Sequence, residues 1–180
     1  MLFCAELARQ EVNDMSLFGI ADLISGGSSS GIKYCLTYDE MNEILIISNA
    51  GKKMIPEEEL KEKVAWYRNK VTKVILDCKA PKSCTCLFKD FTWLREVVCT
   101  ENWDTSDTGT FTGMFSDCPR LETVNGSDWD VSNAHSFMDM FRNCKRLSKV
   151  DLTNWEMSPK ASIGNMFHGC EMLSSIGQPK

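Results

Sequence analysis

The sequence predicts an α/β repeat fold, a short solenoid of 26-residue coils behind an N-terminal cap made of a β-hairpin and a helix. Two observations carry this prediction. Six apolar columns recur in one register from about residue 87 onward, and the polar residues between them recur with the same period. A fixed period of this length is typical of stacked repeats, in which each coil buries its apolar face against the next coil.

The apolar columns contain tryptophan, methionine, phenylalanine, cysteine, leucine, and valine or isoleucine. Their members are Trp103, Trp129 and Trp155; Met114, Met140 and Met166; Phe115, Phe141 and Phe167; Cys118, Cys144 and Cys170; Leu121, Leu147 and Leu173; and Val124, Val150 and Ile176. A degenerate copy precedes them, with Leu87-Phe88 in place of the Met-Phe pair. We expect these columns to form the core, where a large side chain contributes roughly 1.5–3 kcal/mol on full burial.

The polar columns predict the order of elements within each coil. Hydroxyl residues stand before an apolar run, as N-caps of a short helix do, and residues that tolerate the left-handed conformation stand at its end. The first set is Thr110, Ser136 and Ser162, and the second is Asp117, Asn143 and Gly169. A Leu-x-x-Val segment then predicts a short strand. Each coil is therefore expected to be a leucine-rich-type repeat of turn, short helix, cap and strand.

The residues before the repeats predict an α/β capping region. Two β-rich runs around a short turn predict a hairpin, and Pro56 followed by three glutamates predicts the start of a helix. A third strand follows that helix. The expected bounds are 33–38 and 43–48 for the hairpin, 56–69 for the helix and 71–76 for the third strand.

The N-terminal segment predicts a modestly amphipathic helix, tethered by a Gly/Ser-rich linker. Three roles stay open for this helix: a cap folded back on a hydrophobic end, a docking or dimerising element, or a disordered tail. The predicted organisation is an N-terminal helix at 1–25, a linker at 26–31, the capping region at 32–86 and the repeats at 87–180.

Charge and hydropathy limit the classes of partner. The net charge is −5, so a broad basic surface that would bind nucleic acid directly is not expected. Contact with nucleic acid is expected only through a nucleoprotein target. No stretch approaches the roughly 20 apolar residues of a membrane-spanning helix. Residues 1–24 are acidic where a secretory signal peptide would be basic. We therefore expect a cytoplasmic protein without a membrane span, with the cell surface or secretion as the alternative.

Nine cysteines, an odd number, fit reduced thiols better than a disulfide framework. Four of them, Cys78, Cys84, Cys86 and Cys99, are candidate zinc ligands. Their spacing does not match paired Cys-x2-Cys knuckles, and we expect them to pack in the cap without metal. The two histidines fit no catalytic pattern. The sequence thus predicts no enzyme activity and no cofactor.

Several segments of the repeats resemble the BspA-like leucine-rich repeat proteins: Trp-Asp-Thr-Ser at 103–106, Met-Phe-Ser-Asp-Cys at 114–118, Trp-Asp-Val-Ser at 129–132 and Met-Phe-Arg-Asn-Cys at 140–144. The resemblance extends over about 33–180. That family consists mostly of bacterial surface proteins with many ligands, so the resemblance implies the fold and leaves the ligand open. This sequence shows no export signal or C-terminal anchor and has few repeats, which suggests a borrowed module such as a phage or mobile-element inhibitor.

Alternation along the predicted strands identifies a candidate partner-binding row, with a merely solvated sheet as the other interpretation. If the leucine and valine columns point inward, the outward residues are Glu96, Thr123, Asn125, Lys149, Asp151 and Ser175. The apolar side of the N-terminal helix, with Phe3, Leu7 and Phe18, is the second candidate and would also provide a dimer contact. The expected function is a non-enzymatic protein-binding repeat module, with a phage or mobile-element inhibitor of a host defence protein as one form of it. The alternative is a fragment of a secreted or surface adhesin from a host-associated bacterium.

Overall fold

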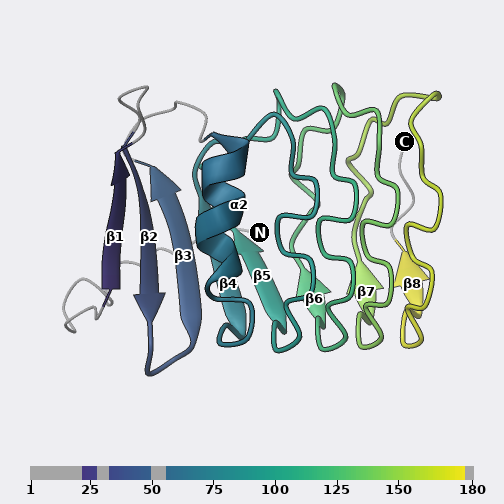
Figure 1. Cartoon of the computed structure of the whole chain (residues 1–180). Helices are drawn as coiled ribbons and strands as arrows, with labels where there is room; N and C mark the ends of the chain where they lie inside the picture. Colours follow the sequence, from purple (N-terminus) through teal and green to yellow (C-terminus); the bar gives the residue numbers. More distant parts are fainter. Residues whose placement is uncertain (1–21, 28–32, 50–55, 177–180) are drawn as a thin grey trace.

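The computed structural model describes residues 22–27, 33–49 and 56–176, which share an eight-stranded sheet whose strands follow one another in chain order (Figure 1). The first three strands are antiparallel and the rest are parallel. The strands are β1 Asp22–Gly27, β2 Lys33–Asp39, β3 Ile44–Asn49, β4 Lys73–Asp77, β5 Glu96–Cys99, β6 Thr123–Val124, β7 Lys149–Val150 and β8 Ser175–Ile176. The predicted solenoid with an N-terminal hairpin and one helix is confirmed.

The capping region follows the predicted order of hairpin, helix and strand. β2 and β3 form the hairpin, and the Asp39 carboxylate accepts hydrogen bonds from the backbone N–H groups of Met41 and Asn42 in the turn, at 2.9 and 3.2 Å. Helix α2, Glu57–Ala65, begins as predicted and buries Leu60 and Val64 against the sheet. It ends four residues earlier than the predicted 56–69, because the chain continues from there in hydrogen-bonded turns.

Strand β1 corrects the predicted boundary between the N-terminal helix and the linker. Residues 22–25 were expected to end the helix and residues 26–27 to begin the linker, yet Asp22–Gly27 pairs along its whole length with β2. The free edge of β2 offers a row of backbone donors and acceptors, and pairing with it outweighs the weak strand preference of two glycines. The rest of the predicted helix, with Phe3, Leu7 and Phe18, and most of the linker lie outside the described residues.

The short helix predicted for each coil is absent from the described part of the repeats, residues 87–176. Two kinds of backbone hydrogen bond alternate in its place. The Met114 N–H donates to the Phe111 carbonyl within the coil at 3.1 Å, and the Phe115 N–H donates to the Met140 carbonyl of the next coil at 2.9 Å. Because alternate amides bond to the next coil, they cannot make the i to i−4 bonds of an α-helix. The segment is therefore a run of tight turns stacked from coil to coil.

The hydroxyl column joins these stacked turns instead of capping helices. Ser83, Thr110, Ser136 and Ser162 pair in sequence as parallel bridges, each with its equivalent in the neighbouring coil. The hydroxyls of Thr112 and Ser136 also lie 2.7 Å apart, which is hydrogen-bond distance across the coil boundary. A second hydrogen-bonded layer thus faces the sheet across the core.

Left-handed residues occur at two positions in each coil, where the tight turns reverse the chain. The predicted capping column is confirmed, with φ of 62° at Asp117, 58° at Asn143 and 77° at Gly169. A second column four residues earlier was not predicted, and it comprises Gly113, Asp139 and Asn165 with φ of 59°, 53° and 56°. In the three regular coils, glycine, aspartate and asparagine occupy both columns because they tolerate this conformation best.

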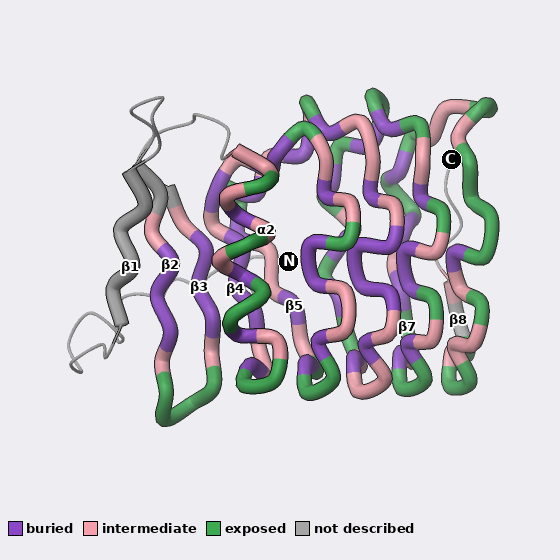
Figure 2. Tube along the Cα trace, viewed as in Figure 1, coloured by how far each residue is buried: buried purple, intermediate pink, exposed green. Residues whose placement is uncertain are grey.

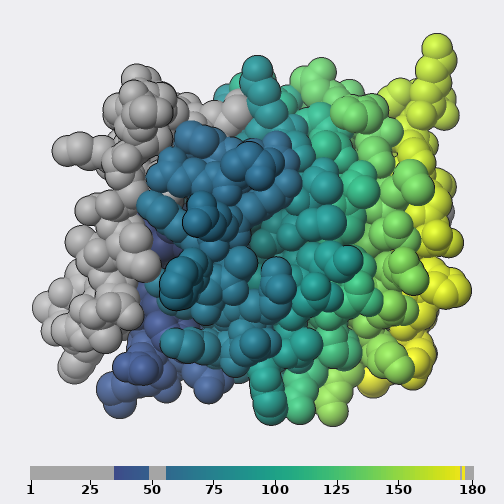
Figure 3. Space-filling model, viewed as in Figure 1, coloured from purple at the N-terminus to yellow at the C-terminus, as the bar shows by residue number. Residues whose placement is uncertain are grey.

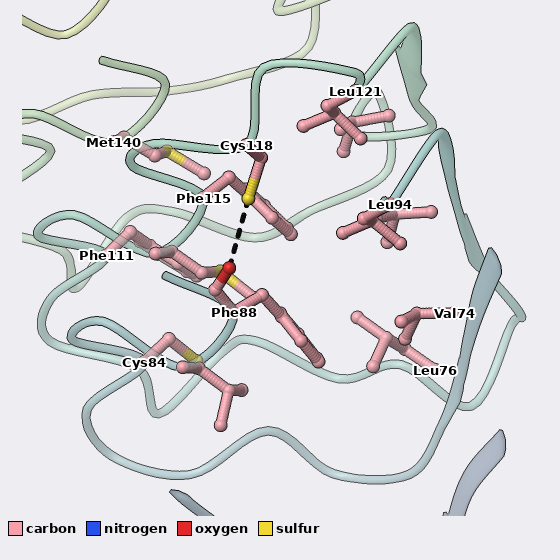
Figure 4. Close-up of a cluster of buried hydrophobic side chains, with 14 of the residues drawn as sticks. Val74, Leu76, Cys84, Phe88, Leu94, Phe111, Phe115, Cys118, Leu121 and Met140 are labelled. Atoms are coloured by element: carbon pink, nitrogen blue, oxygen red, sulfur yellow. Dashed lines mark hydrogen bonds between the residues drawn. The ribbon is translucent and has the colours of Figure 1, made fainter. Parts of the chain in front are cut away.

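The apolar columns form the core, as predicted. The rings of Phe88, Phe115, Phe141 and Phe167 stack in sequence with centroids 5.5–5.6 Å apart and planes within 10° of parallel. Figure 4 shows how Leu94 and Leu121, at the strand side, face this column. Buried stretches recur at corresponding places in the coils, and neighbouring coils lie in direct contact (Figures 2 and 3).

The last described coil is only partly covered. Phe141, Cys144 and Leu147 are buried, whereas their equivalents Phe167, Cys170 and Leu173 are half-buried. In both coils these side chains pack against the preceding coil. The additional burial of Phe141, Cys144 and Leu147 therefore comes from the coil that follows them.

Replacing Phe115 by alanine should lower the free energy of unfolding by about 3–5 kcal/mol, because the ring is fully buried between two others. Phe167→Ala removes the same side chain from the partly covered coil and should cost less than half of that amount. Chemical denaturation of both variants measures the difference. Equal losses would contradict the stacking account.

Asn165→Ala should lower the free energy of unfolding by about 1 kcal/mol, because alanine tolerates the left-handed φ of 56° poorly. Asn165→Gly should keep or raise stability. Lys160→Ala, at an exposed neighbouring position, serves as the control and should change stability by less than about 0.5 kcal/mol. Thermal or chemical unfolding would count against this explanation if alanine and glycine behaved alike at position 165.

Candidate functional site

The predicted polar row lies on the outer sheet face, the face opposite α2 and the core. Register pairs Glu96 with Thr123, Thr123 with Lys149, and Lys149 with Ser175. Asn125 follows the buried Val124 on the same outward side and, like Thr123 and Lys149, is exposed. The structure therefore brings these residues together, at the spacing of about 4.8 Å between neighbouring strands.

Glu96 and Asp151 differ from the exposed members of the polar row because their carboxylates already have partners. Glu96 lies 3.5 Å from the ammonium of Lys73 on β4, in a surface pair of the kind worth 0–1 kcal/mol. The Asp151 carboxylate accepts hydrogen bonds from the hydroxyl and the backbone N–H of Thr153, at 2.6 and 3.1 Å. These bonds, together with the charge of Lys149, lower the pKa of Asp151. Asp151 thus holds a turn at the end of the polar row.

A second charged row, not predicted from the sequence, precedes the strands and contains Arg95, Arg120, Glu122 and Arg146. The Glu122 carboxylate lies 3.8 Å from Arg95 and 3.9 Å from Arg146, so it bridges three coils. Arg120 stacks on the ring of Trp93 with its guanidinium carbon 3.8 Å from the centroid. Arg120 and Arg146 are 26 residues apart, so the periodicity contained a signal for this column.

A shallow acidic cavity of about 410 Å³ opens where the chain leaves β6. It is lined by Ser127, Asp128, Trp129, Asp130, Val131, Ser132, Asn154 and Glu156. The Asp130 carboxylate accepts hydrogen bonds from the Ser132 N–H and hydroxyl at 3.0 and 2.7 Å, so it closes a turn. Neither histidine nor cysteine is among the residues that line the cavity.

The four candidate zinc ligands of the cap differ in their surroundings. Cys78 and Cys84 are buried, Cys99 is half-buried, and Cys86 is exposed with a left-handed φ of 56°. Across the described ranges, no three histidine, cysteine, aspartate or glutamate side chains gather as metal ligands would.

The cysteine column of the repeats is tied to the backbone of neighbouring coils. The thiols of Cys118, Cys144 and Cys170 donate to the carbonyls of Phe88, Phe115 and Phe141 at 3.0–3.1 Å. Burial raises the pKa of the Cys118 and Cys144 thiols far above the usual range, and it raises the pKa of the half-covered Cys170 to about 11. Since the thiolate is the reactive form, these groups are poor nucleophiles.

Alkylation of the folded protein at mildly alkaline pH should therefore follow the order of exposure and ionisation. Cys86 should react first, Cys170 more slowly, and Cys118 and Cys144 last. Mass spectrometry of peptides taken over time measures the order, and labelling in denaturant, where the four should react at similar rates, is the control. A Cys118 that reacts as fast as Cys86 would contradict the packing described above.

No helix in the described ranges is long and apolar enough to cross a membrane.

The comparisons with known proteins found one family and one solved structure that are similar to this chain. No curated protein matches the chain. A solved structure of a leucine-rich cell surface protein from Faecalibacterium prausnitzii A2-165 is similar at a TM-score of 0.36 and 15% identity. That similarity covers 90% of this chain and 44% of the other, so the chain spans less than half of that protein. Residues 66–178, more than half of the chain, match the family described as Mycoplasma protein of unknown function, DUF285, and the chain therefore belongs to the DUF285 family.

Proposed function

We propose that the chain is a non-catalytic protein-binding repeat module that uses the polar row on the outer face of β5 to β8. The observation that carries this proposal is the register of the row, which sets Glu96, Thr123 and Lys149 side by side on successive coils. The core does not require the exposed side chains of Thr123 and Lys149, since the leucine, valine and phenylalanine columns fill it.

The stacked coils support binding by holding this row rigid before a partner arrives. Strands β5, β6 and β7 are each fixed by hydrogen bonds to both neighbours and by the core beneath them, so little conformational entropy is lost there on association. From β5 to β8 the row extends over about 14 Å, which suits a short segment of a protein partner. Its mixed charges and hydroxyls favour a polar partner surface over a lipid or a nucleic acid.

Membership of a family described from Mycoplasma favours a bacterial protein over a phage or mobile-element inhibitor. The resemblance of the repeats to BspA-like proteins, most of which are bacterial surface proteins, supports an adhesin through the leucine-rich-type fold alone. We accordingly propose display at the cell surface as the working location, in place of the cytoplasm.

The double variant Thr123→Arg and Lys149→Glu should lose its protein partner while keeping its fold, because both side chains are exposed in the centre of the row. Lys82→Glu, an exposed charge change in a distant turn, is the matched control and should bind as the unaltered chain does. Immobilised proteins are offered lysate of the source bacterium and, separately, extract of the tissue on which it grows. Bound proteins are then quantified by mass spectrometry.

A protein captured by the unaltered chain and the control, but reduced at least tenfold with the double variant, would support the polar row as the binding site. Capture from tissue extract would favour the adhesin setting, and capture from bacterial lysate would favour an internal target. A double variant that retains the partner at full strength would exclude the polar row.

A further inference from the structure

One outward column of the sheet changes from apolar to polar between β5 and β6. In β3 and β4, residues facing the core alternate with the outward residues Ile44, Ile46 and Ile75, so the middle of these strands is apolar on both faces, with Lys73 and Asp77 on either side of Ile75. The outward residues Ile44, Ile46, Ile75 and Val98 form one group, which we call the apolar patch. Parallel strands with two apolar faces are typically covered on both sides. From β6 onward the corresponding outward position is polar, beginning with Asn125.

The apolar patch is buried, although the core lies on the other side of the sheet. Ile75 is 0% exposed and Ile46 is 4% exposed. The hydrophobic residues that pack against them, Ile44 and Val98, are members of the same face and flank the pair without covering it. Helix α2 contacts the opposite face, because its Leu60 and Val64 belong to the main core. A further layer is therefore needed over the patch, since side chains on an open sheet face keep their ends exposed to solvent.

We infer that residues 2–20 of this same chain, whose sequence predicts an amphipathic helix, dock on the apolar patch. The chain enters the sheet at Asp22, whose strand pairs with β2, and β2 pairs in turn with β3. From β1 to β5 the sheet measures about 19 Å across, and a helix of 19 residues is about 28 Å long. The segment is long enough to cross the patch, and its apolar side, with Phe3, Leu7 and Phe18, matches the patch in chemistry.

This docking goes beyond the proposed function and does not depend on it. It assigns Phe3, Leu7 and Phe18 to the chain's own sheet and leaves the polar row for the protein partner. A second copy of the chain on the same patch is the competing occupant, and the experiment separates the two.

A photo-crosslinking amino acid in place of Phe18 in the full chain tests the contact. Equal amounts of nitrogen-14 and nitrogen-15 protein are mixed, illuminated and digested. We expect crosslinks to peptides containing residues 44–49, 73–77 or 96–98, with both peptides of each pair carrying the same isotope. Pairs of mixed isotope would show a second copy on the patch, and crosslinks confined to other regions would show a different docking place. Either result overturns the inference.

A variant set in the full chain gives an independent measurement. Phe3→Asp, Leu7→Asp and Phe18→Asp together should release the segment and raise the fluorescence of an apolar-surface dye several-fold, with the circular dichroism of the sheet retained. Arg9→Asp with Asn13→Asp, on the opposite side of the predicted helix, is the matched control and should leave dye fluorescence unchanged. Unchanged fluorescence in the triple variant would overturn the inference, and the crosslinking result holds whether or not that variant folds.

Discussion

Stacking of each coil on the next is the interaction on which the rest of the structure depends. A strand of two residues, such as β6 or β7, has no stability of its own, and no coil encloses its own phenylalanine. The neighbouring coil stabilises the strand through parallel hydrogen bonds at the sheet, and it covers the phenylalanine with a stacked ring in the core. The same dependence explains why the side chains of the last described coil are half-buried while their equivalents one coil earlier are buried.

The period of the sequence predicted which residues face the core, because the position within the coil decides which way a side chain points. It could not predict the path of the backbone between them. A Met-Phe pair after Thr110 fits one side of a helix and fits two tight turns equally well. The choice depends on whether an amide such as that of Phe115 bonds within its coil or to the next. The second left-handed column left a readable signal in Gly113, Asp139 and Asn165, since these residue types share one property.

The candidate site was predictable to the same extent. Alternation along the strands placed Thr123, Asn125 and Lys149 outward, and the structure agrees. Alternation does not predict which hydrogen bonds an outward side chain makes. The turn that Asp151 stabilises could therefore not be predicted from the alternation. The same limit applies to Ile75, whose place in an apolar run was visible while its burial on the outer face was not.

The division of the outer face follows from the change in repeat length and composition along the chain. Where α2 and the hairpin replace regular coils, the strands are longer and carry isoleucines on the outer face as well as apolar residues on the core face, so the apolar patch needs a cover. Where the regular coils begin, each strand is two residues long and exposes polar side chains that packing does not constrain. The buried thiols are unsuited to nucleophilic chemistry, because burial disfavours their ionised form. The exposed strand positions of the repeats can therefore differ in chemistry from coil to coil without a change in the core.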